Sequence, residues 1–171
     1  WYLRWFDHRL RGQGDGLAEL KAYTYFMLVD NSWRSADAWP PANARLQRWY
    51  LDSDGKANSR LGNGRLVQVP PGSALTDTFQ YDPANPVPSR GGPLCCTGDP
   101  KERSGPTDQT DVEVRDDVLV YTSEPLPDDL RIAGPLKAHV VVSSSALDTD
   151  LVARLVHVWP DGRATSIQEG A

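Results

Sequence analysis

The sequence has few cysteines, no cluster of basic residues and no long apolar run, and each absence excludes a class of protein. Its two cysteines, Cys95 and Cys96, are adjacent and could close only a strained ring, so the chain is not a disulfide scaffold. A formal charge of -5 without a Lys/Arg patch does not suit nucleic acid or an anionic membrane surface. No apolar run approaches the roughly 20 residues that span a bilayer, and no signal-peptide pattern opens the chain. We therefore expect no nucleic-acid and no membrane partner; the compartment stays open, with a cytoplasmic location favoured.

Motifs for catalysis and for metal binding are also missing. Serine-hydrolase chemistry needs a nucleophile on a Gly-x-Ser-x-Gly elbow, which does not occur here. The nearest set of residue types is Ser143 to Ser145 with His139, His157, Asp148 and Asp150. A chain of this size contains such a scatter without any catalytic role, and a strand end that runs into a polar turn explains it. The histidines and cysteines also lack zinc-ligand spacing. We predict no catalytic residue, no metal ion and no cofactor in this chain.

The segment Asp52 to Asn58 partly resembles a calcium-binding loop, because side chains with oxygen ligands alternate around a glycine. Its glycine, Gly55, comes too early, and no closing acidic residue follows. Since Asp-Gly is a strong turn signal, we interpret the segment as a turn after a strand.

What the sequence does contain is the pattern of short strands and turns of an all-β chain. Its 14 Gly and 14 Pro interrupt regular structure. Runs rich in Val, Leu and aromatic residues predict the strands. We expect strands over residues 23–29, 48–51, 76–81, 118–122, 136–142, 151–159 and 164–168. The turn sequence Trp159-Pro160-Asp161-Gly162-Arg163 joins the last two as a hairpin, and residues 30–41 and most of 55–118 are expected to be loop.

The N-terminal segment differs from the rest, because Leu3, Phe6 and Leu10 recur at helical spacing. The glycine-rich residues 12–16 end this helix and form a linker. A natural chain rarely begins inside a helix with neither Met nor cap, so we expect the sequence to start within a longer protein. We predict a domain boundary here, with residues 1–16 ending one domain and residues 17–171 forming the next.

Six tryptophans leave a second function open. A β-sandwich can present Trp faces to sugar rings, and Trp33, Trp39 and Trp49 lie close together in the sequence. Large aromatic side chains more often fill a core or a domain interface. A carbohydrate-binding module that uses these three residues is therefore the alternative to packing.

An ordered series of segments resembles one protein family along nearly the whole chain. The series comprises Arg4 to His8 with Gly12, Ser32-Trp33-Arg34, Ala38 to Pro41, Tyr81 to Ser89 with Gly91-Gly92, Gly105 to Gln109, Arg115 to Tyr121, Ser143 to Asp150 and Trp159 to Ala164. In order and spacing, these segments are similar to the C-terminal domain of the Xaa-Pro dipeptidyl-peptidase and cocaine esterase family of α/β-hydrolases.

The resemblance implies an all-β fold, a jelly-roll (galactose-binding-like) β-sandwich preceded by one helix of the hydrolase domain. It implies that the Ser, Asp and His catalysts precede Trp1, so that the parent is an enzyme while this segment alone is inactive. Family members continue past Ala171, so we expect the final strands to be missing. The implied partners are the α/β-hydrolase domain of the same polypeptide and, through the parent, a small ester or peptide/acyl substrate. The implied role is to pack on the catalytic domain and help shape its pocket.

The loop after Gly91-Gly92 gives the resemblance its most specific consequence. In relatives this loop extends toward the hydrolase pocket, so Leu94, Cys95 and Cys96 are the expected pocket-lining residues. Three apolar residues behind a Gly-Gly hinge are unusual in a surface loop, which is ordinarily polar. The alternative is a loop that packs only on its own domain. One departure from the family is residues 19–22, where Glu-Leu-Lys-Ala replaces a Pro-Pro-Val approach and leaves the start of the first strand open.

Overall fold

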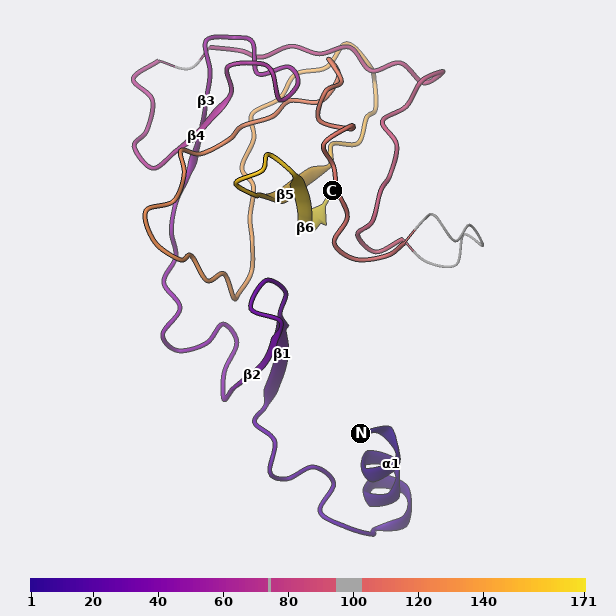
Figure 1. Ribbon diagram of the computed structural model, residues 1–171. Coiled ribbons are helices and arrows are strands. Elements are labelled where there is room, and N and C mark those ends of the chain that lie inside the picture. The colour runs from indigo at the N-terminus through magenta and orange to yellow at the C-terminus, as the bar shows by residue number, and fades with distance from the viewer. Residues whose placement is uncertain (74, 95–102) are drawn as a thin grey trace. The chain divides into compact units, whose positions relative to one another are not determined.

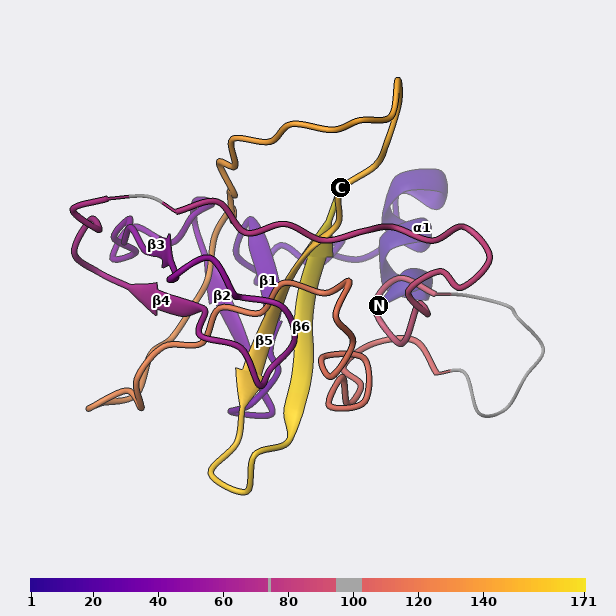
Figure 2. The same cartoon turned by 90° about the horizontal axis from the view of Figure 1, so that it is seen from above.

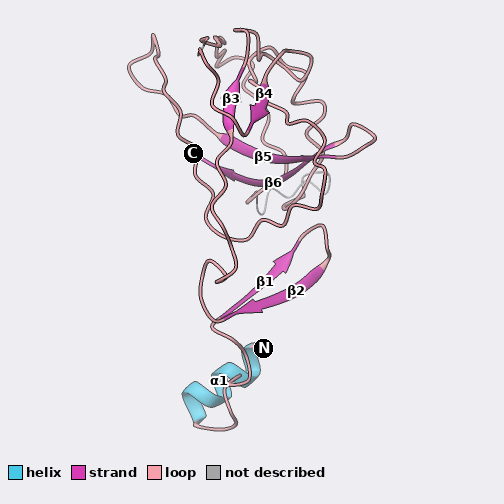
Figure 3. Cartoon of the chain, turned by 90° about the vertical axis from the view of Figure 1, so that its left-hand side faces the viewer, coloured by secondary structure: helices cyan, strands magenta, loops and turns pink. Residues whose placement is uncertain are grey.

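The computed structural model describes residues 1–73, 75–94 and 103–171 of the chain. These residues form α1 (Tyr2–Arg11), β1 (Tyr23–Met27), β2 (Ser32–Ala36), β3 (Tyr50–Asp52), β4 (Arg65–Val67), β5 (Ala153–Val158) and β6 (Ala164–Gly170) (Figure 1). The strands pair into three two-stranded antiparallel sheets, β1–β2, β3–β4 and β5–β6, and long loops connect them (Figure 3). The expectation of a mostly β chain with one N-terminal helix is confirmed at this level.

The chain folds as two compact units. The first comprises residues 1–46 and 131–137, and the second comprises residues 47–130 and 138–171. The first unit therefore contains α1 and the β1–β2 sheet, and the second contains the other two sheets.

Helix α1 forms where the periodicity predicts it and ends at Gly12. This residue adopts the left-handed conformation, with φ 65°, and its N–H donates to the carbonyl of His8 at 3.1 Å. The next N–H, of Gln13, reaches the carbonyl of Asp7, so the last turn is closed by a glycine cap. The apolar side chains of the helix, including Leu3 at 80% exposure, are open to solvent. Among the described residues no helix is long and apolar enough to cross a membrane.

The first unit is built on the β1–β2 hairpin. Strand β1 begins where predicted and ends at Met27, which pairs with Ser32. The expectation of loop throughout residues 30–41 is wrong, because β2 occupies Ser32–Ala36. The polar side chains of β2 carry no strand pattern of their own, and the strand exists through its antiparallel pairing with β1.

The β3–β4 sheet joins a predicted strand to an unpredicted one, because β3 overlaps the strand expected at 48–51 while β4 lies in the region 55–118 that the sequence predicts to be mostly loop. Tyr50 pairs with Val67 and Asp52 with Arg65. The predicted strand at 76–81 is absent, and the one at 118–122 is reduced to isolated bridges that join Leu119 to Asn58 and Thr122 to Arg65. Both expectations are wrong: within the described residues, segment 76–81 makes no β-bridge, and segment 118–122 meets each partner at a single residue, which is too short for a ladder.

The β5–β6 hairpin is the element that the sequence predicts best (Figure 2). Its turn is closed by the N–H of Trp159, which donates to the carbonyl of Arg163 at 2.8 Å, and Gly162 takes a φ of 85°. The register shifts between Leu155 and Val156, which pair with Gln168 and Ser166, so Ile167 is left as the extra residue of a bulge in β6. The turn chemistry of residues 159–163 thus produces the hairpin that it predicts.

The predicted strand at 136–142 is wrong. No strand forms there, and every residue from 138 to 152 is exposed, with Val141 at 102%. Apolar content favours a strand, but a strand also needs an adjacent backbone to satisfy its N–H and C=O groups, and the described residues bring none to this segment.

The buried apolar residues of the described chain are few and small, and comprise Ala57, Val112 and Ala164. The largest fully buried side chain is polar, that of Gln109, which is 1% exposed. The centre of the second unit is therefore organised by hydrogen bonds around Gln109 as much as by apolar packing.

Candidate functional site

Residues 90–92 and 105–107 flank the stretch that carries the predicted pocket residues, and together they form a closed stem, which we call the loop stem. Gly92 and Gly105 make an isolated antiparallel bridge. The N–H of Gly92 donates to the carbonyl of Gly105 at 2.9 Å, and the N–H of Gly105 returns to the carbonyl of Gly92 at 2.8 Å. Residues 93–104 therefore depart from and return to one point of the fold.

Glycine is required in the loop stem for two physical reasons. Gly91, Gly92 and Gly105 all have positive φ, at 70°, 65° and 87°. A Cβ on Gly92 would lie 2.6 Å from Oε1 of Glu169, and a Cβ on Gly91 would lie 2.5 Å from the carbonyl oxygen of Gly105. Gly91 and Gly92 are thus packed too closely against neighbouring groups for a side chain, whereas no atom lies within 4 Å of a Cβ at Gly105.

Beneath the loop stem lies a chain of polar side chains, Gln109, Arg154 and Glu169, which we call the brace. Arg154 and Glu169 are cross-strand partners in β5 and β6, and the guanidinium donates to Oε2 of Glu169 from Nε at 3.0 Å and from Nη2 at 2.5 Å. Their side chains are only 19% and 21% exposed. The other terminal nitrogen of Arg154 donates to Oε1 of Gln109.

Gln109 carries the brace to the loop stem. Its Nε2 donates to the carbonyl of Arg90 at 3.0 Å and to the carbonyl of Thr107 at 3.1 Å, so it holds one residue on each side of the stem. Its backbone N–H donates to the carbonyl of Ala164 in β6 at 2.7 Å. Every polar group of this buried amide is therefore used, and the amide joins the stem to the hairpin.

A second tie joins the stem to β6. The N–H of Thr107 donates to Oγ of Ser166 at 3.0 Å, and the N–H of Ser166 donates to the carbonyl of Thr107 at 3.0 Å. Asp108 and Thr165 add an isolated antiparallel bridge next to it. The returning half of the stem is therefore tied to β6 at Thr107 and Asp108.

Glu113 adds an acidic group near the brace. Its side chain is buried, and burial raises the pKa of its carboxyl above the usual value. The positive charges of Arg60 and Arg154 act in the opposite direction, and the charge of Asp108 reinforces the rise. The residues around Gln109 thus form a polar cluster with charges of both signs.

A second polar cluster, around Asp77, holds other loops of the same unit together. Oδ2 of Asp77 accepts hydrogen bonds from the hydroxyls of Ser53 and Tyr121, both at 2.7 Å, and Oδ1 accepts one from the N–H of Ala57 at 2.8 Å. Burial opposes ionisation of Asp77, but these three hydrogen bonds outweigh it and hold the pKa of Asp77 below its usual value. Burial and the neighbouring Asp77 raise the pKa of Tyr121, so its hydroxyl remains a donor.

The predicted pocket residues lie just beyond the loop stem. Leu94 is half-buried, whereas Cys95 and Cys96 lie outside the residues that the structure describes. Sequence reasoning finds the Gly-Gly hinge but misses Gln109, Arg154 and Glu169. Gln109 stands 45 positions before Arg154, and no spacing rule connects an amide with an arginine over such a separation.

The three tryptophans of the carbohydrate alternative are distributed over both units. Trp33, 69% exposed, packs edge-on against Phe26, with ring centroids 5.2 Å apart. Trp39 packs against two tyrosines of β1, Tyr23 and Tyr25. Trp49 belongs to the second unit and is half-buried. Trp33 and Trp39 therefore contact other aromatic side chains, but they keep 69% and 41% of their surface exposed.

The scatter of triad residue types does not assemble into a catalytic site in the described part of the chain. Residues 143–145 are exposed, and Oγ of Ser144 accepts a hydrogen bond from the N–H of Ala146 at 3.0 Å, which makes a local turn. His157 instead stacks on Trp159, with ring centroids 4.4 Å apart. Residues 1–73, 75–94 and 103–171 also contain no group of three or more His, Cys, Asp or Glu side chains that could hold a metal ion.

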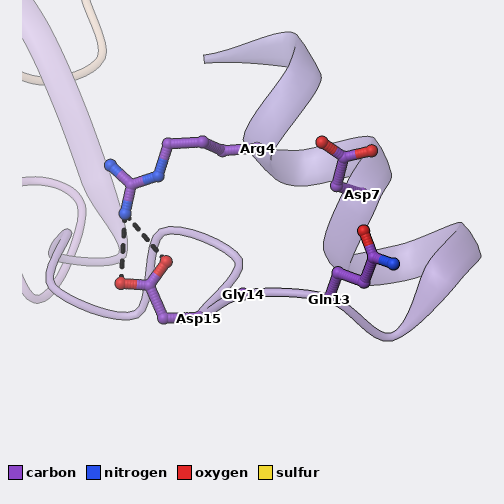
Figure 4. A pocket seen from close by; sticks show the side chains of 5 residues that line it. All are labelled: Arg4, Asp7, Gln13, Gly14 and Asp15. Carbon is purple, nitrogen blue, oxygen red and sulfur yellow. Dashed lines mark hydrogen bonds and ion pairs between the residues drawn. The ribbon is translucent and has the colours of Figure 1, made fainter.

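A small surface cavity of about 140 Å³ lies in the first unit, between α1 and the linker that follows it (Figure 4). Its lining residues are Arg4, Asp7, Gln13, Gly14 and Asp15. Arg4 donates to both oxygens of Asp15 across it, at 2.8 and 3.1 Å, and this pairing lowers the pKa of Asp15. Both side chains are more than half exposed, so the cavity is a solvated surface pair and a poor ligand site.

The chain is similar to one family model and to several curated proteins. Residues 9–171 match a family model described as the X-Pro dipeptidyl-peptidase C-terminal non-catalytic domain. Cocaine esterase from Rhodococcus sp. (strain MB1 Bresler) is 42% identical over 166 residues, which is 96% of this chain and 28% of that protein. Two proteins named "Putative serine esterase", from Mycobacterium bovis and Mycobacterium tuberculosis, are each 28% identical over 98% of this chain and 25% of their own length. The chain thus spans about a quarter of the length of these curated relatives.

Proposed function

Because the chain belongs to the family of the X-Pro dipeptidyl-peptidase C-terminal non-catalytic domain, we propose that it is the accessory β-domain of a serine hydrolase. The observation that carries this proposal is the match of residues 9–171 to a domain described as non-catalytic, in relatives about four times as long. The catalytic Ser, Asp and His belong to another part of the same polypeptide. The described residues of this chain contain no hydrogen-bonded Ser-His-Asp triad that would suggest a different location for the catalytic residues.

The first task of the domain is to pack on the catalytic domain. We assign residues 1–16 to the end of the hydrolase domain and residues 17–171 to a jelly-roll (galactose-binding-like) sandwich. The support is the apolar surface that the chain leaves open, as on α1 and on residues 138–152. Surface of this kind is covered in a functioning protein, by strands that complete the sandwich or by the neighbouring domain.

The second task is to shape the substrate pocket through Leu94, Cys95 and Cys96. In a hydrolase that acylates a serine, a wall of apolar side chains selects among acyl groups by packing and takes no part in proton transfer. One methylene of misfit in such a wall changes transition-state binding by about 1–3 kcal/mol. The support from this chain is a loop that begins with half-buried Leu94 on a closed stem.

The substrate class that we favour is a small ester. The three relatives carry esterase names, and the cocaine esterase is the most similar of them at 42% identity. The name of the family model also brings an Xaa-Pro amide into consideration. Both reactions use an acyl-enzyme, so the accessory role is the same for either bond.

The test uses the full-length protein that carries this domain. Its kcat/KM is measured on p-nitrophenyl esters of increasing acyl length and on Xaa-Pro p-nitroanilides, before and after Leu94→Ala, Cys95→Ala and Cys96→Ala. We expect at least one substitution to change the ratio of kcat/KM between short and long acyl groups by about tenfold. Leu61→Ala, at a side chain that is 84% exposed in this chain, is the matched control. An unchanged substrate profile in all three variants contradicts the pocket role.

A further inference from the structure

We propose that Gln109, Arg154 and Glu169 are positioning residues that fix the departure of the loop 93–104 and thereby set the acyl selectivity of the parent hydrolase. The inference rests on the proposed function, since it needs that loop to reach a substrate pocket. It goes beyond it by assigning a role to residues that lie below the loop, in β5, in β6 and in the segment before them.

The first step of the argument is that the loop stem does not hold itself. The bridge between Gly92 and Gly105 has two backbone hydrogen bonds, and an isolated pair of this kind is marginal in water. Its glycines also lose more backbone freedom on ordering than any other residue type. An additional constraint is therefore needed to keep the stem in one place.

The second step is that the brace supplies this constraint from both sides. Gln109 donates to the carbonyls of Arg90 and Thr107, which flank the bridge. Glu169 lies so close to Gly92 that a Cβ there would overlap its carboxylate. The stem is thus held by hydrogen bonds from Gln109, and the Glu169 carboxylate limits the space beside Gly92.

The third step is that the chemistry of each brace residue fits its neighbours. Gln109 accepts from Arg154 with one side-chain atom and donates to two carbonyls with the other, which neither a carboxylate nor an aliphatic side chain can do. Arg154 reaches Glu169 and Gln109 at once through its forked guanidinium. Since Gln109 is fully buried, these hydrogen bonds hold parts of the second unit together in the interior and are not a surface salt bridge.

The consequence for substrate choice is geometric. A displacement of about 1 Å at the position where a pocket wall departs changes reaction rates, because reacting groups must meet within a narrow range of distances. A rigid stem therefore lets a loop act as a defined wall.

The experiment compares Gln109→Glu with Gln68→Glu in the full-length protein. Gln68 is exposed, so the control makes the same change of charge where no brace exists. Two quantities are measured, the hydrogen exchange of the Gly92 and Gly105 amides and the ratio of kcat/KM between short and long acyl esters. For Gln109→Glu we expect exchange at both amides to accelerate about tenfold and the acyl ratio to change by roughly threefold or more, while Gln68→Glu changes neither.

A glycine pair provides an independent second test. Gly92→Ala and Gly105→Ala both place a side chain at positive φ, but only the Cβ at position 92 meets another group, the Glu169 carboxylate. We expect the larger change of acyl ratio for Gly92→Ala. Shortening the neighbour in the double variant Gly92→Ala/Glu169→Ala should give a change that is not the sum of the two single variants. Equal effects of the two glycine variants contradict a supporting role of Glu169.

The outcomes separate this inference from the proposed function. If Leu94→Ala or the cysteine variants alter the acyl ratio and Gln109→Glu leaves both amide exchange and acyl ratio unchanged, the brace is wrong and the accessory pocket role stands. If Gln109→Glu accelerates exchange but no variant of the loop or brace alters the ratio, the pocket role fails, and the assignment of selectivity to the brace fails with it.

Discussion

Two neighbouring regions of the second unit are similarly rich in apolar residues, but only one of them forms strands. Residues 153–170 form the β5–β6 hairpin, with Ala164 and Ser166 buried in β6. The segment just before it, residues 138–152, includes Val140, Val141 and Val142, yet it contains no strand and each of its residues is exposed. Apolar composition therefore does not distinguish the two regions.

The difference lies in how each region obtains a partner. The turn at residues 159–163 returns the chain directly beside β5, so pairing requires only a short loop closure. No turn sequence returns a partner to residues 138–152. The comparison teaches that an apolar segment of this chain forms a strand only where a second backbone segment lies beside it. That second segment is positioned either by a turn or by hydrogen bonds from buried polar groups.

The largest expected effect comes from placing a charge in the ordered region. Ala164 is fully buried, so Ala164→Asp should destabilise the chain by about 3 kcal/mol or more, because the new carboxylate has no partner. Val141→Asp, at a side chain that is fully exposed in this chain, is the matched control; measured on residues 1–171 alone, where nothing covers Val141, it should change stability by no more than about 0.5 kcal/mol. Urea unfolding of both variants measures the difference. Equal losses would remove the distinction between the two regions.

The next effect concerns Asp77, which ties loops together without a turn. Its folded-state pKa lies below the unfolded value of about 3.9, so its contribution to stability is present above that pH. It is lost as the pH falls through the folded pKa. We expect Asp77→Asn to lose roughly 1–2 kcal/mol at neutral pH and to be less sensitive to acid than the wild type.

Unfolding free energies measured across acid pH check this prediction. Asp116→Asn is the control, since its side chain is exposed and makes none of these bonds. A parallel pH dependence of wild type and Asp77→Asn would show that polar groups do not order this region.

A smaller effect is expected at the turn of the hairpin. Gly162 has a φ of 85°, a conformation that costs a residue with a side chain roughly 1 kcal/mol. Gly162→Ala should therefore lower Tm by about 2–4 °C, as expected for a chain of this length. Gly170→Ala, where φ is ordinary and no atom lies within 4 Å of the new Cβ, should leave Tm unchanged. Thermal unfolding followed by circular dichroism measures both, and a loss of equal size at Gly170 would contradict the role of the turn.

The smallest effect is expected for a surface ion pair beside the loop stem. Arg90 and Asp111 lie 2.6 Å apart, but their side chains are 46% and 57% exposed. Asp111→Asn should change stability by no more than about 0.5 kcal/mol, and less in high salt. Glu169→Gln, which weakens the half-buried pair with Arg154, should cost more. Denaturant unfolding at two salt concentrations compares the two variants, and a reversed order would contradict the importance of the brace.

The parts of the fold that the sequence predicts are those with local causes. Helix α1 follows from apolar spacing and a glycine cap, and the β5–β6 hairpin follows from its turn sequence. Strand β2 escapes prediction because Ser32–Ala36 is polar and owes its conformation to β1. The segment 136–142 misleads in the opposite direction, since its pattern is that of a strand and the described chain offers it no partner.

The candidate site likewise has one part that the sequence predicts and one part that it does not. The Gly-Gly hinge is visible in the sequence because two adjacent glycines announce an unusual backbone, and both take positive φ. The brace is not visible, since Gln109, Arg154 and Glu169 meet only after the hairpin and a long loop have come together. A lone glutamine in a polar stretch gives no indication that it will be the most deeply buried large side chain.

Because Gly92 and Gly105 are bridged to each other, the sequence of residues 93–104 between them can be replaced as one piece. Both ends of the stretch are paired with each other, so a change in its length does not require its anchor points to separate. Doubling the length of a flexible loop costs only about 0.6 kcal/mol in closure entropy. A library of sequences between these two glycines therefore varies the stretch that we propose to line the pocket and keeps both of its anchor points, which makes this stretch a suitable place to engineer new substrate preferences.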